Sequence, residues 1–256
     1  MKRPDWPESY PLSFERAMEL VNGRLGHVYR EIARKCMSPV MWFCPGPRPS
    51  ILHSGTVTVV QGPSRIFGIT AAHVLEQYRR DAGEAPVSIQ ILDRLIDEME
   101  VIDSSEKRDL ATINLAEGLV KSLGLEPLQW PPAPPTERRG IIMAGYPAEW
   151  RTEVRPMELE WKTFSAITTA RTVTQEQVVA LISREEWVSN TLPLNSNLGG
   201  ISGGPIIGLF EGPGNVCFHQ LSGIITEHPN YIDSDFTIER IAGTLADFIS
   251  ESGKIY

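Results

Sequence analysis

Short apolar runs rich in β-branched residues recur along the chain, and each run ends near glycine, proline or charged residues. Apolar and polar positions alternate within several of them, which is the period of a strand with one buried face. The pattern predicts strands at residues 40–44, 55–60, 65–70, 87–92, 95–102, 110–115, 140–147, 161–172, 177–183, 206–209 and 217–226. Between the two halves, Pro127 to Pro135 is typical of an extended connector. The chain is therefore predicted to be all-β.

Two segments have helical spacing instead. From Ser13 to Lys35 apolar residues recur every three or four positions, so we expect a helix against the first group of strands. Gly23 and Gly26 each weaken a helix by about 1 kcal/mol, which predicts a kink or a split there. A second helix is expected from Ile238 to Ser252, because apolar residues fall on one face and Gly253 follows.

Composition excludes several classes of function. The 256 residues are 41% hydrophobic and carry a net charge of −8, so no excess of cations is present to bind a nucleic-acid backbone. No apolar run has the length of a signal peptide or a membrane span, so we expect a cytoplasmic protein without a membrane partner. The three cysteines, Cys36, Cys44 and Cys217, cannot all pair, which predicts reduced thiols that pack as small buried apolar groups.

Four glycines surround a serine between Leu198 and Pro205, the segment with the clearest chemical signal. Glycine is costly to order, so such a cluster marks a positive φ or a close approach, both of which a turn that presents amide N–H groups requires. The simplest alternative is a hairpin loop that happens to contain Ser202. The G-x-S-x-G pattern also matches the nucleophile elbow of α/β-hydrolases, but that elbow precedes a helix, whereas Pro205 and a β-branched run follow here.

A serine nucleophile needs an imidazole base and a carboxylate that orients it, and both have candidates upstream. His73 ends the stretch Thr70-Ala71-Ala72-His73 after a predicted strand, and its small neighbours permit a tight turn. Asp109 opens the strand at residues 110–115, while Asp103 is the rival carboxylate. We favour Asp109 because a buried strand follows it directly. His27, within the first predicted helix, is interpreted as a surface or packing residue.

These three stretches, T-A-A-H, D-L-A and G-x-S-G-G-P, resemble the motifs of the trypsin/chymotrypsin-like serine peptidases. The resemblance implies a chymotrypsin-like fold of two six-stranded antiparallel Greek-key barrels, here with an added N-terminal helix and a C-terminal helix. It also implies that His73, Asp109 and Ser202 are catalytic, that the N–H groups of Gly200 and Ser202 form the oxyanion hole, and that no cofactor or metal takes part.

The chain departs from that family at two positions, and the second departure makes the resemblance closer to bacterial members. Secreted members brace the histidine loop with a disulfide, but Val74 stands where they carry cysteine. Digestive members have an acid before the nucleophile, and here Ile201 occupies that place. The residues after Ser202 are too few for the PDZ domain that high-temperature-requirement proteases carry downstream.

The resemblance further implies a division into a helical extension at residues 1–38, a first barrel at 39–130 and a second barrel at 131–256. Substrate-binding residues are expected at Ser196, near the base of the specificity pocket, and along Thr226, Glu227 and His228, which would pair with the substrate backbone. Thr226 falls where the family has a hydroxyl beside the aspartate. The loop from Trp187 to Asn197 is expected to line the pocket wall.

Two functions remain open at this point. The first is a serine endopeptidase that cleaves a protein or peptide substrate, and the second is a catalytically silent domain of the same fold that binds peptides. The intact set of His73, Asp109 and Ser202 favours the enzyme, because a binding module needs none of the three. The preferred residue at the cleavage site and the oligomeric state do not follow from the sequence.

Overall fold

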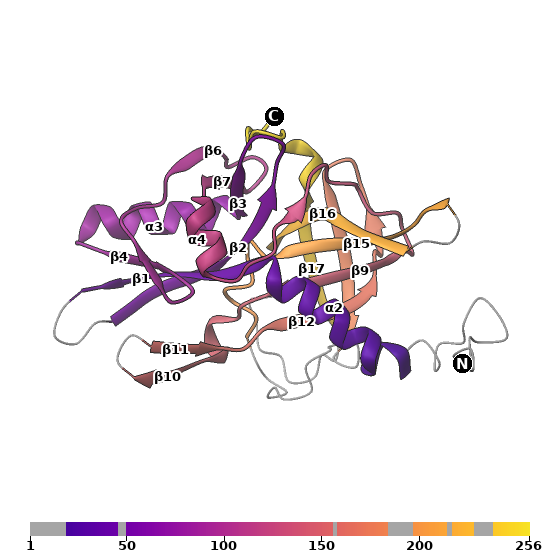
Figure 1. The fold of residues 1–256 in the computed structure, drawn as a ribbon, viewed down its shortest axis with the longest axis horizontal. Helices are drawn as coiled ribbons and strands as arrows, with labels where there is room; N and C mark the ends of the chain where they lie inside the picture. The colour runs from indigo at the N-terminus through magenta and orange to yellow at the C-terminus, as the bar shows by residue number, and fades with distance from the viewer. Residues whose placement is uncertain (1–18, 46–49, 156–157, 184–196, 214–216, 228–237) are drawn as a thin grey trace.

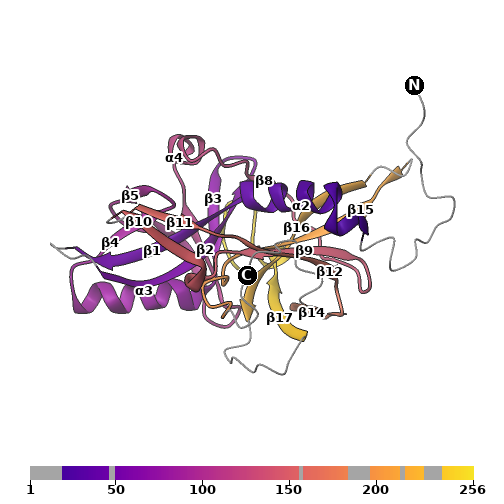
Figure 2. The same cartoon turned by 90° about the horizontal axis from the view of Figure 1, so that it is seen from below.

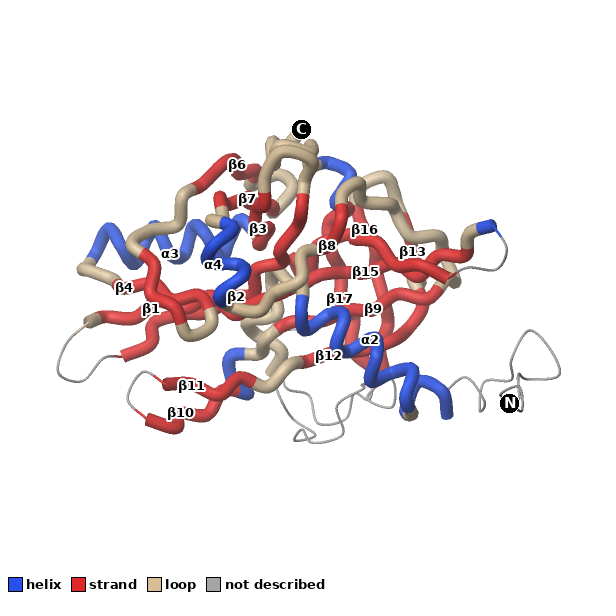
Figure 3. Tube along the Cα trace, in the orientation of Figure 1, coloured by secondary structure: helices blue, strands red, loops and turns tan. Residues whose placement is uncertain are grey.

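Two curled antiparallel sheets stand side by side and make up most of the molecule (Figures 1 and 3). The computed structural model describes residues 19–45, 50–155, 158–183, 197–213, 217–227 and 238–256. All strands of the first sheet precede residue 130, and all strands of the second follow residue 139. The predicted division at residues 38 and 130 stays a prediction. Within the described ranges, no helix is long and apolar enough to cross a membrane.

The first sheet has the order β5-β4-β1-β2-β3-β7-β6, and the short β8 pairs with β2 in parallel. The remaining pairs are antiparallel. Its strands are β1 (Met37–Cys44), β2 (Ser50–Gln61), β3 (Ile66–Thr70), β4 (Ser88–Ile91), β5 (Arg94–Ile96), β6 (Val101–Ser105), β7 (Leu110–Asn114) and β8 (Leu128–Gln129).

The second sheet has the order β12-β9-β15-β16-β17-β14-β13. A separate hairpin, β10 (Arg151–Arg155) with β11 (Glu158–Trp161), stands apart from it. Thr168 on β12 donates a hydrogen bond to the Leu181 carbonyl on β14 at 3.5 Å, so the sheet curls until these two strands meet. Its strands are β9 (Gly140–Gly145), β12 (Phe164–Thr169), β13 (Thr172–Val173), β14 (Gln177–Ser183), β15 (Pro205–Glu211), β16 (Cys217–Glu227) and β17 (Ile238–Leu245).

The two sheets share one strand plan. Taking the main strands of each sheet in chain order as 1 to 6, with β5 and β13 as extensions, the first runs 4-1-2-3-6-5 and the second 2-1-4-5-6-3. When the two ends of each order are joined, both sheets give the same circular order, 1-2-3-6-5-4. The circle is open between strands 5 and 4 in the first sheet and between strands 2 and 3 in the second. The predicted fold class, an all-β chymotrypsin-like fold with two Greek-key barrels, is confirmed.

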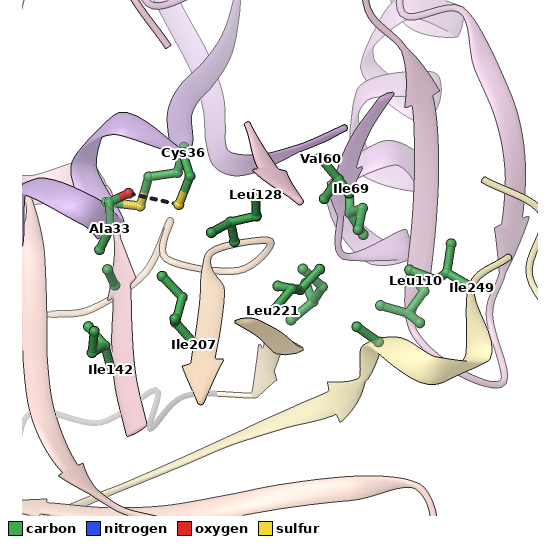
Figure 4. Packing of buried hydrophobic residues seen from close by; sticks show 14 of the residues in the cluster. Ala33, Cys36, Val60, Ile69, Leu110, Leu128, Ile142, Ile207, Leu221 and Ile249 are labelled. Atoms are coloured by element: carbon green, nitrogen blue, oxygen red, sulfur yellow. Dashed lines mark hydrogen bonds between the residues drawn. The ribbon is translucent and has the colours of Figure 1, made fainter. Parts of the chain in front are cut away.

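A shared apolar core joins the two barrels. Figure 4 shows Val60, Ile69 and Leu110 of the first barrel and Ile142 and Ile207 of the second within one cluster of buried side chains. Each of these side chains is almost fully buried. Separate clusters fill the two barrel interiors. Burial of this much apolar surface between the barrels fixes their relative position, on which any site between them depends.

The predicted N-terminal helix is present from residue 19 and splits at Gly23, as expected, while residues 13–18 lie outside the described ranges. Residues 19–22 are helical, the Gly23 N–H bonds the Leu20 carbonyl, and α2 (Arg24–Lys35) continues the segment. Its buried Ala33 joins the shared core, and Figure 2 shows the helix lying over the second sheet near β9. The prediction that it packs against the first group of strands is therefore wrong. Two helices were not predicted, α3 (Ala72–Glu84) and α4 (Glu117–Ser122).

The predicted C-terminal helix is wrong. Residues 238–245 form strand β17, which lies between β16 and β14, and a short 3-10 turn, η4 (Ala246–Phe248), follows. Every residue of β17 from Ile241 to Leu245 is buried, so this part of the strand lacks the alternation that marks a half-exposed strand. Gly243 belongs to this packing, because a Cβ there would lie 2.3 Å from the Ile224 carbonyl oxygen.

Two further predictions need correction. The expected strand at residues 95–102 is broken into β5 and β6, with residues 97–100 outside both. Of the three thiols, Cys36 is buried but Cys44 is half-buried and Cys217 is exposed, so the expectation of three buried thiols is wrong. All three are free. Burial raises the pKa of Cys36 to about 12, which makes it an inert packing group.

Gly55 on β2 packs directly against Val74 on α3. A Cβ built at Gly55 would lie 2.7 Å from Val74 Cγ1 and 3.5 Å from Val74 Cβ. A Cβ to Cβ separation of about 3.5–4.5 Å is what a disulfide requires. The valine side chain therefore fills the space between these two elements that a bridge could occupy.

We predict that a Gly55→Cys, Val74→Cys double variant forms a disulfide when oxidised. The bridge closes a loop of 74 − 55 = 19 residues, so the oxidised form should be more stable than the reduced form by about 3 kcal/mol. Urea unfolding of one preparation with and without reductant measures the difference, and Val74→Cys alone is the control. A midpoint that does not respond to reductant in the double variant would show that the two Cβ atoms do not approach.

Candidate active site

His73 lies in the first turn of α3, directly after β3 has crossed the barrel. Ala71 is extended and fully buried, and Ala72 is 2% exposed, so the small residues let the chain turn against the barrel wall. The imidazole itself is half exposed, at 49% of its side-chain surface. It lines a cavity of about 750 Å³. The two alanines thus place the ring at a cavity wall.

Asp109 binds His73 with both carboxylate oxygens. Its Oδ2 lies 2.8 Å from His73 Nδ1, and its Oδ1 accepts the His73 backbone N–H at 2.9 Å. Asp109 has a left-handed backbone (φ 49°), and its N–H bonds the Glu106 carbonyl at the end of a turn. Since a carboxylate only accepts, Nδ1 carries the proton and Nε2 is left as the acceptor. The hydrogen bond to Asp109 raises the pKa of His73 against the opposing effect of burial.

The rival carboxylate has another partner. Asp103 accepts the Ser104 N–H at 2.9 Å and the Ile255 N–H at 3.0 Å, so it ties the end of the chain to β6. Both its oxygens are engaged away from His73. Of the two candidates, the structure brings only Asp109 to the imidazole.

The second barrel holds the turn that presents Asp109. Thr244 on β17 donates its hydroxyl to the Arg108 carbonyl at 2.7 Å. The Arg108 guanidinium carbon lies 3.6 Å from the centre of the Phe248 ring, and Arg108 also pairs with Glu176 at 2.5 Å. These contacts join the neighbour of Asp109 to β17, to η4 and to the loop before β14, and so fix the position of the carboxylate.

Ser202 lies at the top of a turn that only glycine can form. Gly200 and Gly203 have φ values of +101° and +91°. A Cβ at Gly203 would lie 1.9 Å from the Thr56 carbonyl oxygen, and one at Gly204 would lie 2.0 Å from that of Ala144. The turn leads into strand β15 and not into a helix, which excludes the nucleophile elbow of α/β-hydrolases. Ser202 itself is 3% exposed and lines the same cavity as His73.

The carbonyls of this turn are anchored, and two of its N–H groups bind no other group within the described residues. The Gly199 carbonyl accepts the Ala148 N–H at 2.6 Å, and the Ile201 carbonyl accepts the Gly204 N–H at 2.9 Å. In a trans peptide the following N–H points the opposite way, so the N–H groups of Gly200 and Ser202 are directed away from these partners. Neither N–H has a hydrogen-bond partner in the part of the chain that the structure describes. Two unpaired donors beside a hydroxyl can bind a developing oxyanion.

Thr56 on β2 connects the serine turn to the first barrel. Its N–H bonds the Ser202 carbonyl at 2.9 Å, and its hydroxyl donates to the Gly200 carbonyl at 2.9 Å while accepting the Tyr146 N–H at 3.0 Å. Thr70 in turn donates its hydroxyl to the Thr56 carbonyl at 2.8 Å. Sequence reasoning missed these threonines. The available signal was the pair Thr56 and Thr58 at alternate positions of an otherwise apolar strand, since buried hydroxyls need partners.

One cavity brings several of the predicted residues together. His73, Gly200 and Ser202 line it, and Thr226 and Glu227 line it from β16. No hydrogen bond joins Ser202 Oγ to His73 among the described residues, and such bonds often tighten only when substrate binds. The first barrel and α3 supply the further lining residues Trp42, His53, Ser54, Val74, Glu76, Gln77 and Arg80.

The remaining predicted site residues have mixed outcomes. Thr226 is 8% exposed, but within the described ranges it makes no hydrogen bond to Asp109, contrary to the implied contact. Glu227 pairs with Arg240 at 2.9 Å. Ser196 and His228 lie outside the described residues, as does most of the loop from Trp187 to Asn197.

Ile201, the apolar residue before Ser202, is fully buried in the core of the second barrel. Its Cα lies 2.8 Å from where a Cβ on Gly145 would stand, so a glycine on β9 makes room for it. The serine turn is therefore anchored on one side by apolar packing and on the other by Thr56. Neither anchor needs an ion pair at position 201.

Comparison with known proteins gives a likeness in structure alone. No family model matches the chain, and no curated protein sequence matches it. Among solved structures, the chain is similar to kallikrein-related peptidase 10, with 18% sequence identity and a TM-score of 0.45 over 81% of this chain and 88% of that chain.

Proposed function

We propose that this protein is a serine endopeptidase that acts through an acyl-enzyme intermediate. The observation that carries the proposal is one cavity lined by a carboxylate-bound imidazole, a serine and the residues of two backbone N–H groups that have no partner among the described residues. Each is a part that acyl transfer requires, and a peptide-binding module would need none of them. The proposed substrate is a protein or a peptide.

In the proposed reaction, Ser202 Oγ attacks the scissile carbonyl carbon and His73 Nε2 takes the hydroxyl proton. Asp109 stabilises the imidazolium that forms and keeps the proton of Nδ1 in place. The N–H groups of Gly200 and Ser202 bind the oxyanion, and the imidazolium then protonates the leaving amine as the C–N bond breaks. Water, deprotonated by His73, attacks the acyl-enzyme and releases Ser202.

The acyl part of the substrate is proposed to lie along the end of β16. Thr226 and Glu227 line the cavity there, and β16 is irregular between Ile225 and Glu227 in its pairing with β17. An extended peptide can add to such a strand end through its backbone groups. Glu227 forms an ion pair with Arg240, so the opposite charges of these two side chains cancel here.

Ser202→Ala is expected to abolish covalent labelling by a fluorophosphonate probe and to lower kcat by about six orders of magnitude, as loss of the nucleophile does in subtilisin. Labelling followed by mass spectrometry measures the first, and hydrolysis of a chromogenic ester the second. Ser222→Ala is the matched control, because that buried hydroxyl bonds the Ala133 carbonyl away from the cavity. A wild-type protein that binds peptides but takes no label would favour the silent binding module instead.

Asp109→Asn is expected to lower kcat by about four orders of magnitude, the drop seen for the equivalent change in a Ser-His-Asp enzyme. Catalysis needs neutral His73, and the contact with Asp109 raises the pKa of His73. In the wild type, kcat/KM should therefore rise with pH through a value above the ordinary histidine pKa of about 6.5. The rise should move to lower pH in Asp109→Asn.

The control for that change is Asp103→Asn, which should keep kcat within a few-fold of wild type because Asp103 contacts the chain end and not His73. The two variants are compared over the same pH range. A crippled Asp103→Asn protein beside an active Asp109→Asn protein would overturn the assignment of the carboxylate.

Thr56→Val is expected to lower kcat by about ten- to a hundredfold with little change in KM, because the Gly200 carbonyl loses its anchor and the oxyanion donors lose their alignment. The unpaired Gly200 and Tyr146 groups should also cost about 1–3 kcal/mol of stability. Thr112→Val removes a comparable buried hydrogen bond, to the Gly253 carbonyl, far from the cavity. Equal loss of kcat in both variants would mean that Thr56 acts only through stability.

A further inference from the structure

The imidazole of a second imidazole–carboxylate pair lines the same cavity. His53 on β2 places its Nδ1 2.8 Å from Oδ2 of Asp81, which lies on α3 eight residues after His73. The His53 side chain is half exposed at 51%, whereas Asp81 is 13% exposed. The proposed reaction uses neither residue, so the pair is a feature of the cavity wall that still needs a role.

Asp81 is held as a carboxylate by three donors. Besides His53, it accepts the indole N–H of buried Trp42 at 2.6 Å and the side-chain amide of Gln77 at 3.0 Å. Burial alone would raise the pKa of Asp81, but these hydrogen bonds together lower it. The carboxylate is consequently ionised at neutral pH and can only accept.

This arrangement fixes the tautomer and the position of His53. Since Asp81 only accepts, Nδ1 of a neutral His53 carries the proton and Nε2 presents a lone pair. The ring packs 5.9 Å from the Trp42 ring, centre to centre, which restricts its rotation. A rigid hydrogen-bond acceptor on a cavity wall is a means of recognising a donor on a ligand.

The place of His53 indicates which part of a substrate it meets. His73 and Ser202 line the cavity together, the end of β16 lines it from the second barrel, and His53 lines it from the first barrel beside residues of α3. An acyl group along β16 directs the leaving-group side of the substrate away from β16 and toward the lining that the first barrel and α3 supply. Glu76 and Arg80 carry opposite charges in this part of the lining, so it has little net charge with which to select a charged substrate residue.

We propose that His53 forms a subsite for a substrate residue on the leaving-group side that carries a neutral hydrogen-bond donor, a hydroxyl or a carboxamide. Asp81 acts as its positioning residue by fixing the proton on Nδ1. The inference rests on the proposed function for the direction of the substrate, but the acceptor and its orientation do not depend on catalysis.

Acyl transfer to added amines tests the subsite without knowledge of the acyl specificity. The protein is acylated with p-nitrophenyl acetate, and Thr-Ala-amide, Val-Ala-amide, Ala-Thr-amide and Ala-Val-amide compete with water for the acyl group. At one of the two peptide positions, the threonine peptide should be acetylated about three- to tenfold faster than its valine counterpart, because it makes one additional hydrogen bond. His53→Phe should remove the preference and His27→Phe, at an exposed histidine on α2, should keep it. A wild type without preference, or a His53→Phe variant that keeps it, overturns the proposal.

If the protein forms no acyl-enzyme, that result contradicts the proposed function but leaves the subsite at His53 to be tested by binding. Fluorescein-labelled forms of the same peptides are then titrated against Ser202→Ala by fluorescence anisotropy. Tighter binding of a threonine peptide, lost in the Ser202→Ala, His53→Phe double variant, supports the subsite. Equal binding of the pairs, or no binding, overturns it.

The role of Asp81 has a spectroscopic readout. Nitrogen-15 spectra should show His53 protonated on Nδ1 in the neutral wild type, and Asp81→Asn should populate the Nε2 tautomer and weaken the threonine preference. Both changes should occur in a protein that remains folded by circular dichroism. A wild-type His53 protonated on Nε2 contradicts the proposal, because that nitrogen would then donate.

Discussion

The close contact between strand β2 of the first barrel and the glycine turn of the second is the constraint on which the candidate site depends. The Thr56 carbonyl occupies the space that a side chain at Gly203 would need, at 1.9 Å from a Cβ built there. The same residue anchors the Ser202 and Gly200 carbonyls. The Gly199 and Ile201 carbonyls are anchored as well, by the N–H groups of Ala148 and Gly204. The N–H groups of Gly200 and Ser202 share peptide planes with these two carbonyls, so they have a fixed direction, and neither has a partner among the described residues. Unpaired donors that are held in place can bind an oxyanion without reorganising during the reaction.

The dependence between the barrels is reciprocal. The first barrel holds the serine turn through Thr56, and the second holds the aspartate turn through Thr244, which bonds the Arg108 carbonyl. The shared apolar core lies between these two sets of hydrogen bonds and sets the distance between them. A small shift of one barrel would therefore move the serine and the imidazole in relation to each other. The large buried surface opposes such a shift, since close-packed side chains resist displacement.

Features set by local sequence were predictable, and features set by distant contacts were not. The hairpin of β2 and β3, the split at Gly23 and the glycine turn follow from neighbouring residues and agree with the structure. The helix predicted at residues 238–252 is wrong because residues 241–245 of β17 are all buried, so the strand shows no alternation there. The roles of Thr56 and of Asp81 depend on partners that are far away in the sequence. The alternation of Thr56 and Thr58 could indicate buried hydroxyls but not the groups that they bind.

The two imidazole–carboxylate pairs on the cavity show how similar groups can acquire different chemistry. Asp109 directs both of its oxygens at His73, one to the ring and one to the backbone, so an imidazolium at His73 is stabilised by a carboxylate whose bonds all go to that residue. Asp81 divides its oxygens among three donors, one of them the buried indole of Trp42. The difference suits His73 to exchange a proton with Ser202, whereas Asp81 holds the proton of His53 on Nδ1 and leaves Nε2 as a fixed acceptor on the same cavity.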